Sequence, residues 1–306
     1  MIKILFMGTP KFSVPILDAL ANDERYEIVG VVTQPDKIGG RGHNLIMSPV
    51  KEYAIEKNFK IFQPEHIKDQ YDELINLGAD IIITAAYGQF VGTRLLDSPR
   101  FKAINCHGSL LPKYRGGSPI QTAIKNGDKE TGITIMYMIK EMDAGDIIAQ
   151  RSIPIEDSDT NGTLFDKLSY LARDLLMDTL PLIIEGKINP IKQDESLVTF
   201  AYNIKKEEEL IDFNLDARSI FNQIRAFNPE PTAYMKLKDD EIKVYESIVL
   251  DETSDLKPGS ILLNQKGHLK MVCGNKTVLE ILSLKPAGKK LMTGRDFLNG
   301  HVNKYL

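Results

Sequence analysis

The run IKILFMGTPKFSVPILDAL, residues 2–20, decides which class of fold this chain forms. Its first six residues are mostly apolar and long enough for a buried strand, and a Gly-Thr-Pro turn follows them. After the turn, Phe12, Ile16 and Leu20 recur at helical spacing, and Ser13 is the expected N-cap of that helix. A buried strand that leads through a short turn into an amphipathic helix is typical of a βαβ unit.

The same alternation continues through the first half of the chain. Apolar runs of strand length follow at residues 26–34, 60–64, 79–88, 101–107 and 131–139, and helical segments lie between several of them. Strands that alternate with helices predict a mostly parallel sheet with both faces covered. We therefore predict an α/β fold for this half, a Rossmann-like doubly wound sheet.

The pattern changes after a long amphipathic helix, which Leu164, Leu168, Leu171 and Leu175 mark by their spacing. A polar stretch without periodicity follows, and beyond it come a predicted hairpin and several short strands separated by Gly turns. Short strands packed into about 100 residues predict a small β-barrel of the oligonucleotide-binding type. The expected organisation is a catalytic domain over residues 1–188, a linker over 189–207 and a C-terminal β-barrel over 208–306.

Composition places the chain among ordinary globular proteins, with 306 residues of which 42% are hydrophobic and 26% charged. Two cysteines, Cys106 and Cys273, provide no disulfide framework and fit a reducing compartment. No apolar stretch approaches the ~18 residues typical of a membrane span, and the N-terminus lacks a signal-peptide pattern. We expect a cytoplasmic protein with no membrane partner, and a monomer by default.

Charge is distributed unevenly along the chain. From Lys257 onward there are nine Lys or Arg residues and two acidic ones, a net charge of +7. Since the whole chain carries −4, the first 256 residues carry −11. An acidic body with a basic C-terminal segment indicates a polyanionic partner, although a solvated Lys-rich surface would give the same count.

Neither glycine-containing turn near the N-terminus fits a nucleotide site. The turn after the first strand has only Gly8 of the dinucleotide fingerprint, and Pro10 removes a backbone donor. The GGRG sequence at 39–42 lacks the Lys-Ser/Thr pair of a phosphate-binding loop. The histidines are scattered without ligand spacing, so we predict no metal site.

The stretch NCHGSLLPKYRGGSP, residues 105–119, carries the chemistry. Asn105 and His107 end a predicted parallel strand, and ligands bind at the carboxyl edge of open α/β sheets. Histidine exchanges a proton near neutral pH, and an asparagine amide stabilises an oxyanion by hydrogen bonding. The pair therefore predicts acid–base chemistry at a carbonyl group.

A carboxylate to orient the imidazole is available in EMDAGD, where Asp143 and Asp146 follow a neighbouring strand. Ser109 is the only hydroxyl near His107, but it lacks the setting of a nucleophile elbow, which argues against a Ser-His-Asp hydrolase. A histidine after a strand and an aspartate in a turn are also common structural residues. The residues alone leave a catalytic and a structural interpretation open.

Taken together, the motifs resemble a known family. NCHGSLLPKYRGGSPIQTAI, followed downstream by DAGD, is similar to the signature of the enzymes that transfer a formyl group from 10-formyltetrahydrofolate to an amine. The likeness extends over both predicted domains through MGTPKFSVPILDAL, TQPDKIGGRG, FNPEP and LSLKPAGKK. It is greatest to the branch of the family that formylates initiator methionyl-tRNA.

This resemblance implies a role for each matching residue. Asn105 stabilises the oxyanion, and His107, held by Asp143, handles the proton; no metal takes part. The implied folate-binding residues are Ser109, Leu110, Leu111, Pro112, Ala86, Tyr87 and Gly88. The implied tRNA-binding residues are Arg41, Lys289 and Lys290. The co-substrate is 10-formyltetrahydrofolate and the partner is initiator methionyl-tRNA.

Four alternatives remain at this point. A formyltransferase acting on a nucleotide-sugar amine shares SLLP, but its pattern has proline directly after the histidine, where this chain has Gly108. The formyltransferase of purine synthesis is a single domain and would leave the last hundred residues unexplained. A formyltetrahydrofolate hydrolase would use the same Asn-His-Asp set with water as nucleophile. An RNA-binding module without catalysis would not explain that set.

Overall fold

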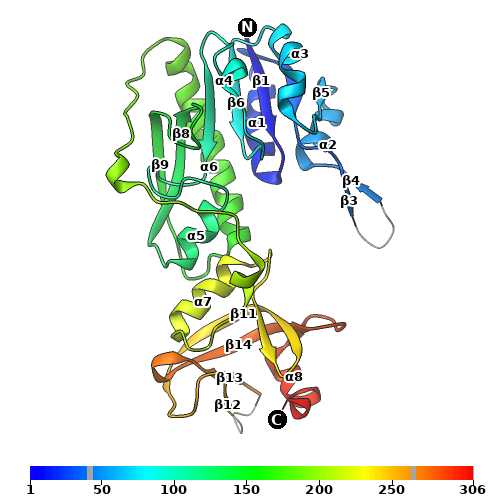
Figure 1. Cartoon of the computed structure of the whole chain (residues 1–306), viewed down its shortest axis with the longest axis vertical. Coiled ribbons are helices and arrows are strands. Elements are labelled where there is room, and N and C mark those ends of the chain that lie inside the picture. Colours follow the sequence, from blue (N-terminus) through cyan, green and yellow to red (C-terminus); the bar gives the residue numbers. More distant parts are fainter. Residues whose placement is uncertain (40–43, 263–266, 306) are drawn as a thin grey trace. The chain divides into compact units, whose positions relative to one another are not determined.

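The computed structural model describes residues 1–39, 44–262 and 267–305, and the chain divides into two compact units (Figure 1). Unit 1 comprises Met1–Pro119, Thr131–Ile153 and Phe165–Tyr202. Unit 2 comprises Ile120–Glu130, Pro154–Leu164 and Asn203–Leu306.

Unit 1 is built on a seven-stranded sheet with the order β5-β2-β1-β6-β7-β8-β9. The strands are β1 (Ile2–Gly8), β2 (Tyr26–Val32), β5 (Ile61–Phe62), β6 (Ile81–Ala85), β7 (Ala103–His107), β8 (Glu130–Tyr137) and β9 (Ile147–Pro154). The first five in this order run parallel to one another, and β8 runs antiparallel to β7. The prediction of a mostly parallel α/β sheet is confirmed.

Short helices follow the strands of unit 1, and one long helix crosses it. They are α1 (Val14–Ala21), α2 (Pro49–Glu56), α3 (Tyr71–Asn76), α4 (Thr93–Leu96) and the long α6 (Asn161–Ile184), with 3-10 turns η1 (Lys11–Ser13), η2 (Ile67–Gln70) and η3 (Glu195–Leu197). The first turn of α6 and nearly all of α5 (Pro119–Lys125) belong to unit 2. A separate hairpin pairs β3 (Lys37–Gly39) with β4 (Asn44–Ile46). No helix in the described ranges is long and apolar enough to span a membrane.

Ser13 occupies the N-cap position of α1, as predicted, but its side chain has a different role. Its side chain makes no capping hydrogen bond to α1. The hydroxyl instead donates to the carbonyl of Ala85 over 2.6 Å, and the residue is fully buried. The predicted position is confirmed, but the capping hydrogen bond is absent because the carbonyl of Ala85 at the end of β6 takes the hydroxyl, and sequence spacing contains no information about that carbonyl.

Residues 191–201, which we call the strap, fall in the polar stretch expected to be a linker, yet they belong to unit 1. Ile191 forms a bridge with Ile147, and Phe200 forms another with Arg115. The strap therefore pairs with the first residue of β9 and with the loop that follows β7. These backbone hydrogen bonds explain why a sequence without apolar periodicity has a defined path.

Unit 2 holds an antiparallel sheet with the order β10-β11-β14-β13-β12, and β15 pairs with β14 outside this path. Its elements are η4 (Lys206–Glu209), α7 (Ala217–Ala226), β10 (Tyr234–Leu237), β11 (Asp240–Thr253), β12 (Ile261–Leu262), β13 (Leu269–Val272), η5 (Gly274–Lys276), β14 (Thr277–Pro286), β15 (Met292–Thr293), α8 (Gly294–Gly300) and η6 (Val302–Lys304). The short strands and the hairpin were predicted, whereas α8 was missed. Thr293 caps α8 by accepting from the backbone N–H of Asp296, a Thr-x-x-Asp signal visible in the sequence.

The packing of α6 gives the first prediction. Leu168 is fully buried, whereas Leu182 on the same helix is exposed. We expect Leu168→Ala to lower the free energy of unfolding by about 2–5 kcal/mol, because the lost contacts leave a cavity. Urea denaturation followed by circular dichroism measures this change. Leu182→Ala is the control, and an equal loss for both variants would contradict the burial of Leu168.

Candidate active site

The carboxyl end of β7 brings the predicted residues to one edge of the sheet. In the parallel pairing with β6, Asn105 lies opposite Thr84. In the antiparallel pairing with β8, His107 lies opposite Thr134. Cys106, between them, points into the core, and burial raises the pKa of its thiol to about 12. Asn105 and His107 are therefore the residues of this strand end that can meet a ligand.

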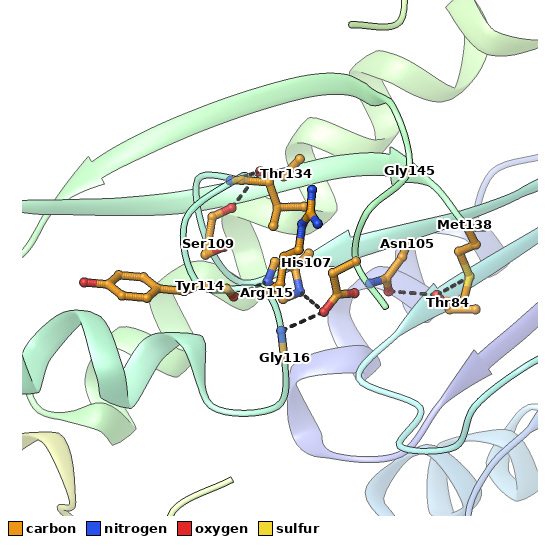
Figure 2. A network of polar contacts seen from close by, with 12 residues as sticks. Thr84, Asn105, His107, Ser109, Tyr114, Arg115, Gly116, Thr134, Met138 and Gly145 are labelled. Atoms are coloured by element: carbon orange, nitrogen blue, oxygen red, sulfur yellow. Dashed lines mark hydrogen bonds and ion pairs between the residues drawn. The ribbon is translucent and has the colours of Figure 1, made fainter. Parts of the chain in front are cut away.

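The amide of Asn105 is held in one orientation. The Thr84 hydroxyl donates to Oδ1 of Asn105 over 2.7 Å (Figure 2). With Oδ1 engaged in this way, the two N–H groups on Nδ2 point away from Thr84 (Figure 2). Asn105 is half-buried, so its amide can reach a bound molecule. The arrangement leaves a fixed donor aimed out of the sheet edge.

His107 is 6% exposed and has a neighbour at each ring nitrogen. Nε2 lies 2.9 Å from the carbonyl oxygen of Tyr114, and since a carbonyl only accepts, Nε2 carries the hydrogen. Nδ1 faces Oδ2 of Asp143 over 3.6 Å, longer than a hydrogen bond. Nδ1 is therefore the nitrogen that can gain or lose a proton while the ring stays anchored.

Asp143 comes from the turn after β8, as predicted, and its side chain is 15% exposed. Its Oδ2 accepts from the backbone N–H of Gly116 over 2.9 Å. The turn is tight, because a Cβ added to Gly145 would lie only 1.8 Å from the carbonyl oxygen of Tyr137. Asp146, the other carboxylate considered, is exposed. The structure thus brings Asn105, His107 and Asp143 together.

The SLLP loop after His107 is fixed from β8 and β9. Thr134 Oγ1 donates to the carbonyl of Ser109 over 2.7 Å and accepts from the N–H of Leu111 over 3.0 Å. Gln150 donates from Nε2 to the carbonyl of Leu111 over 2.8 Å. The Ser109 hydroxyl donates to the carbonyl of Lys113 over 2.6 Å and is buried. It closes the loop and is not paired with His107, which argues against Ser109 as a nucleophile.

The other predicted folate residues differ in exposure. In the SLLP loop, Leu110 and Pro112 are half-buried, whereas Leu111 is buried. After β6, Ala86 and Gly88 are exposed, with φ of +48° and +90°. The Tyr87 side chain between them packs in the core with Leu5, Met7 and Val32, and burial raises the pKa of its hydroxyl. The 86–88 turn therefore presents its main chain and the small side chain of Ala86 to the outside.

The structure describes two of the three predicted tRNA residues, and both belong to unit 2. Arg41 lies outside the described residues. Lys289 and Lys290 are exposed in the turn between β14 and β15 of unit 2. Within the described ranges, no group of three or more His, Cys, Asp or Glu side chains is placed to hold a metal ion.

Three residues that support the site were not found from sequence. Thr84 orients Asn105, and its position at the end of the strand before β7 was the available signal. Arg115 lies inside the quoted motif and is buried. Gln193 lies in the strap and donates to the carbonyl of Asp143. Nothing in the polar stretch distinguishes Gln193 from its neighbours.

Comparisons with known proteins identify the family. Residues 2–180 match the family model described as formyl transferase, and residues 203–302 match formyl transferase, C-terminal domain. The methionyl-tRNA formyltransferase of Pediococcus pentosaceus is 50% identical over 300 residues, covering 97% of this chain and 94% of the relative. That of Limosilactobacillus fermentum is 52% identical over 303 residues, covering 98% and 96%.

Solved structures share the fold at lower identity. An N-formyltransferase from Helicobacter canadensis, in complex with folinic acid and dTDP-3-aminofucose, has a TM-score of 0.67 and 20% identity, covering 94% of this chain and 100% of its own. HypX from Aquifex aeolicus, in complex with tetrahydrofolic acid, has a TM-score of 0.64 and 15% identity, covering 98% of this chain and 47% of its own.

The two family models and the sheet-edge site define the class of protein as a formyl transferase, a one-carbon group-transfer enzyme. On identities of 50% and 52% along nearly whole chains, this chain belongs to the methionyl-tRNA formyltransferase family. The family that the sequence motifs implied is confirmed.

The contact between Thr84 and Asn105 gives the second prediction. We expect Thr84→Val to lower kcat of formyl transfer about fivefold to tenfold, since losing one hydrogen bond of ~1 kcal/mol leaves the amide free to turn. Steady-state kinetics measure the change. Thr33→Val is the matched control, a buried threonine whose hydroxyl pairs with Ser48. Equal kcat values for the two variants would show that Thr84 does not orient the amide.

Proposed function

We propose that this protein transfers the formyl group of 10-formyltetrahydrofolate to the α-amino group of methionine on initiator tRNA. The observation that carries the proposal is the arrangement at the end of β7. The free amide N–H groups of Asn105 and Nδ1 of His107 lie at the same sheet edge, and Nδ1 is 3.6 Å from Asp143. An oxyanion donor next to a proton acceptor suits transfer of an acyl group to an amine.

Asn105 acts on the oxygen of the formyl group. As the amine attacks the formyl carbon, negative charge builds up on that oxygen in the tetrahedral adduct. Nδ2 of Asn105 donates to it, and because Thr84 holds the amide beforehand, no reorientation is needed during the reaction. The removal of one such donor typically costs about 2.7–4 kcal/mol of transition-state stabilisation.

His107 balances the protons. The attacking amine must lose one proton, and the nitrogen released from the formyl group must gain one. Nδ1 of His107 accepts the first proton and returns it to the leaving nitrogen, so no proton is consumed overall. The carboxylate of Asp143 stabilises the imidazolium that exists between the two steps, while the Tyr114 carbonyl keeps the ring in place.

The folate donor fits the surfaces beside Asn105. The SLLP loop, residues 109–112, offers half-buried apolar side chains on a backbone that Thr134 and Gln150 hold rigid. The 86–88 turn offers exposed main chain on the second proposed wall. A flat heteroaromatic group with polar edges needs such an apolar wall together with backbone donors and acceptors.

Unit 2 supports the proposal that the acceptor is a tRNA. We propose the domain limits 1–188, 189–207 and 208–306, with the antiparallel sheet of unit 2 as a barrel of the oligonucleotide-binding type. Lys289 and Lys290 would contact phosphates there, and Arg41 would do so near the acceptor end. Such contacts fix position and strengthen binding without recognising sequence. A monomer in the cytoplasm, where translation takes place, completes the proposal.

The proposal is tested with purified protein, 10-formyltetrahydrofolate and methionyl-tRNA of initiator and elongator type in parallel. Formylmethionine on the initiator tRNA is the expected product, and the elongator tRNA should react far more slowly. Formate release without tRNA would instead identify a hydrolase. Formylation of a nucleotide-sugar amine and not of tRNA would identify the sugar-modifying activity.

Substitutions of the two strand-end residues give the third prediction. We expect Asn105→Ala to lower kcat about 10²–10³-fold, because the oxyanion loses its donor. His107→Ala should lower kcat about 10²–10⁴-fold, because proton transfer is lost. The dissociation constant for tRNA, measured by filter binding, should stay near that of wild type. Asn76→Ala, at the exposed end of α3, is the control, and a large loss of tRNA affinity in the first two variants would contradict a catalytic role.

The exposed lysines of unit 2 give the fourth prediction. We expect Lys289→Ala together with Lys290→Ala to weaken tRNA binding and to reduce the slope of log K against log salt by about 2, one unit for each lost phosphate contact. Filter binding at several salt concentrations measures the slope. The control removes the same charge at Lys57 and Lys68, which are also exposed and lie outside the basic C-terminal segment. A slope unchanged from wild type would assign Lys289 and Lys290 to the solvated surface.

A further inference from the structure

A buried polar pair lies behind the proposed site and has no part in the chemistry described so far. Arg115, from the loop after β7, is 5% exposed, and Gln193, from the strap, is 4% exposed. An arginine is almost never buried to this degree unless its guanidinium is fully paired. The partners of these two side chains therefore indicate why the fold retains them.

Both the nitrogen and the oxygen of the Gln193 amide form hydrogen bonds. Nε2 donates to the carbonyl of Asp143 over 2.8 Å and to the carbonyl of Gly145 over 2.8 Å. These carbonyls belong to the turn that presents the Asp143 carboxylate to His107. Both hydrogens of the amide thus bind one turn, and they fix its orientation at two points.

Arg115 holds the other end of that amide. Its Nε and Nη2 donate to Oε1 of Gln193 over 3.0 and 2.9 Å, a fork that leaves the amide one orientation. The same guanidinium also donates to Glu195, whose side chain is 67% exposed. Glu195 accepts from Nη2 over 2.8 Å and from Nη1 over 3.3 Å, from the solvent side of the guanidinium.

The position of Arg115 in the chain links this pair to both sides of the imidazole. The preceding residue, Tyr114, supplies the carbonyl that accepts from Nε2 of His107. The following residue, Gly116, supplies the N–H that donates to Oδ2 of Asp143. The main chain of Arg115 is tied to the strap, since its N–H donates to the carbonyl of Thr199 and its carbonyl accepts from the N–H of Ala201.

We infer that Gln193 is a positioning residue for formyl transfer, and that Arg115 orients it. Gln193 sets the distance between the Asp143 carboxylate and Nδ1 of His107 by clamping the backbone of the turn. This inference rests on the proposed function, because it assigns Gln193 to the proton-transfer step of that reaction. A displacement of about 1 Å at such a contact can cost about 10²-fold in rate.

Gln193→Glu tests the inference with a side chain of the same shape. The carboxylate keeps both acceptor bonds from Arg115, but it loses both donors and places an oxygen against the carbonyls of Asp143 and Gly145. We expect kcat of formyl transfer to fall about 10²-fold with KM for both substrates nearly unchanged. Glu195→Gln is the matched control, since it alters the exposed partner of Arg115 and should leave kcat near wild type.

A second readout does not depend on activity. In protein labelled with ¹⁵N-histidine, the signal of Nδ1 of His107, assigned with His107→Gln, should shift in Gln193→Glu and stay in place in Glu195→Gln. If Gln193→Glu does not fold, Gln193→Met, which lacks both donors and adds no charge, takes its place with the same expectations.

The possible outcomes distinguish a failure of the proposed function from a failure of the positioning role of Gln193. Wild-type protein that makes no formylmethionyl-tRNA would refute the proposed function, and the histidine signal would still show whether Gln193 positions Asp143. An active wild type, with Gln193→Glu within about threefold of Glu195→Gln in kcat and no shift of the His107 signal, would overturn the positioning role. A parallel rise of KM with the fall of kcat would assign Gln193 to substrate binding and would equally overturn it.

Discussion

The pairing register of β7 is the constraint on which the site depends. On one side β7 pairs in parallel with β6, which sets Asn105 opposite Thr84, and on the other it pairs antiparallel with β8, which sets His107 opposite Thr134. A slip of one residue would turn every side chain of the strand to the other face of the sheet. Asn105 would then lose Thr84, and the side chains of Asn105 and His107 would both turn away from the site.

The loop that follows β7 has no regular secondary structure, but hydrogen bonds hold it on two sides. This explains how an irregular backbone can form a rigid site. Thr134 and Gln150 bind its first half from β8 and β9, and the strap binds its second half through Arg115. These hydrogen bonds form when the protein folds, so the hydrogen-bond donors and acceptors of the site are in position before substrates bind. A site organised in this way loses little entropy or solvent reorganisation during the reaction.

Sequence predicted those parts of the molecule that depend on local pattern. Apolar runs gave the strands and their parallel arrangement, and the strand-end positions gave Asn105, His107 and Asp143. Thr84, Ser13 and Gln193 escaped because their roles arise from partners that lie 21, 72 and 50 residues away along the chain. Such long-range hydrogen bonds leave no periodic signal. For the same reason, the sequence gives no sign of the backbone hydrogen bonds that Ile191, Thr199 and Ala201 of the strap form with the rest of unit 1.

The strap also determines where the chain can be divided. Unit 1 extends to Tyr202, well past the end of α6 at Ile184, and the extra residues contribute both Gln193 and the backbone partners of Arg115. A fragment or chimera joined just after the helix would keep every strand of the unit 1 sheet together with Asn105, His107 and Asp143, but it would lack Gln193 and the backbone partners of Arg115. Exchange of the C-terminal region between relatives therefore requires a junction after Tyr202, so that the strap and the sheet to which it is hydrogen-bonded come from the same protein.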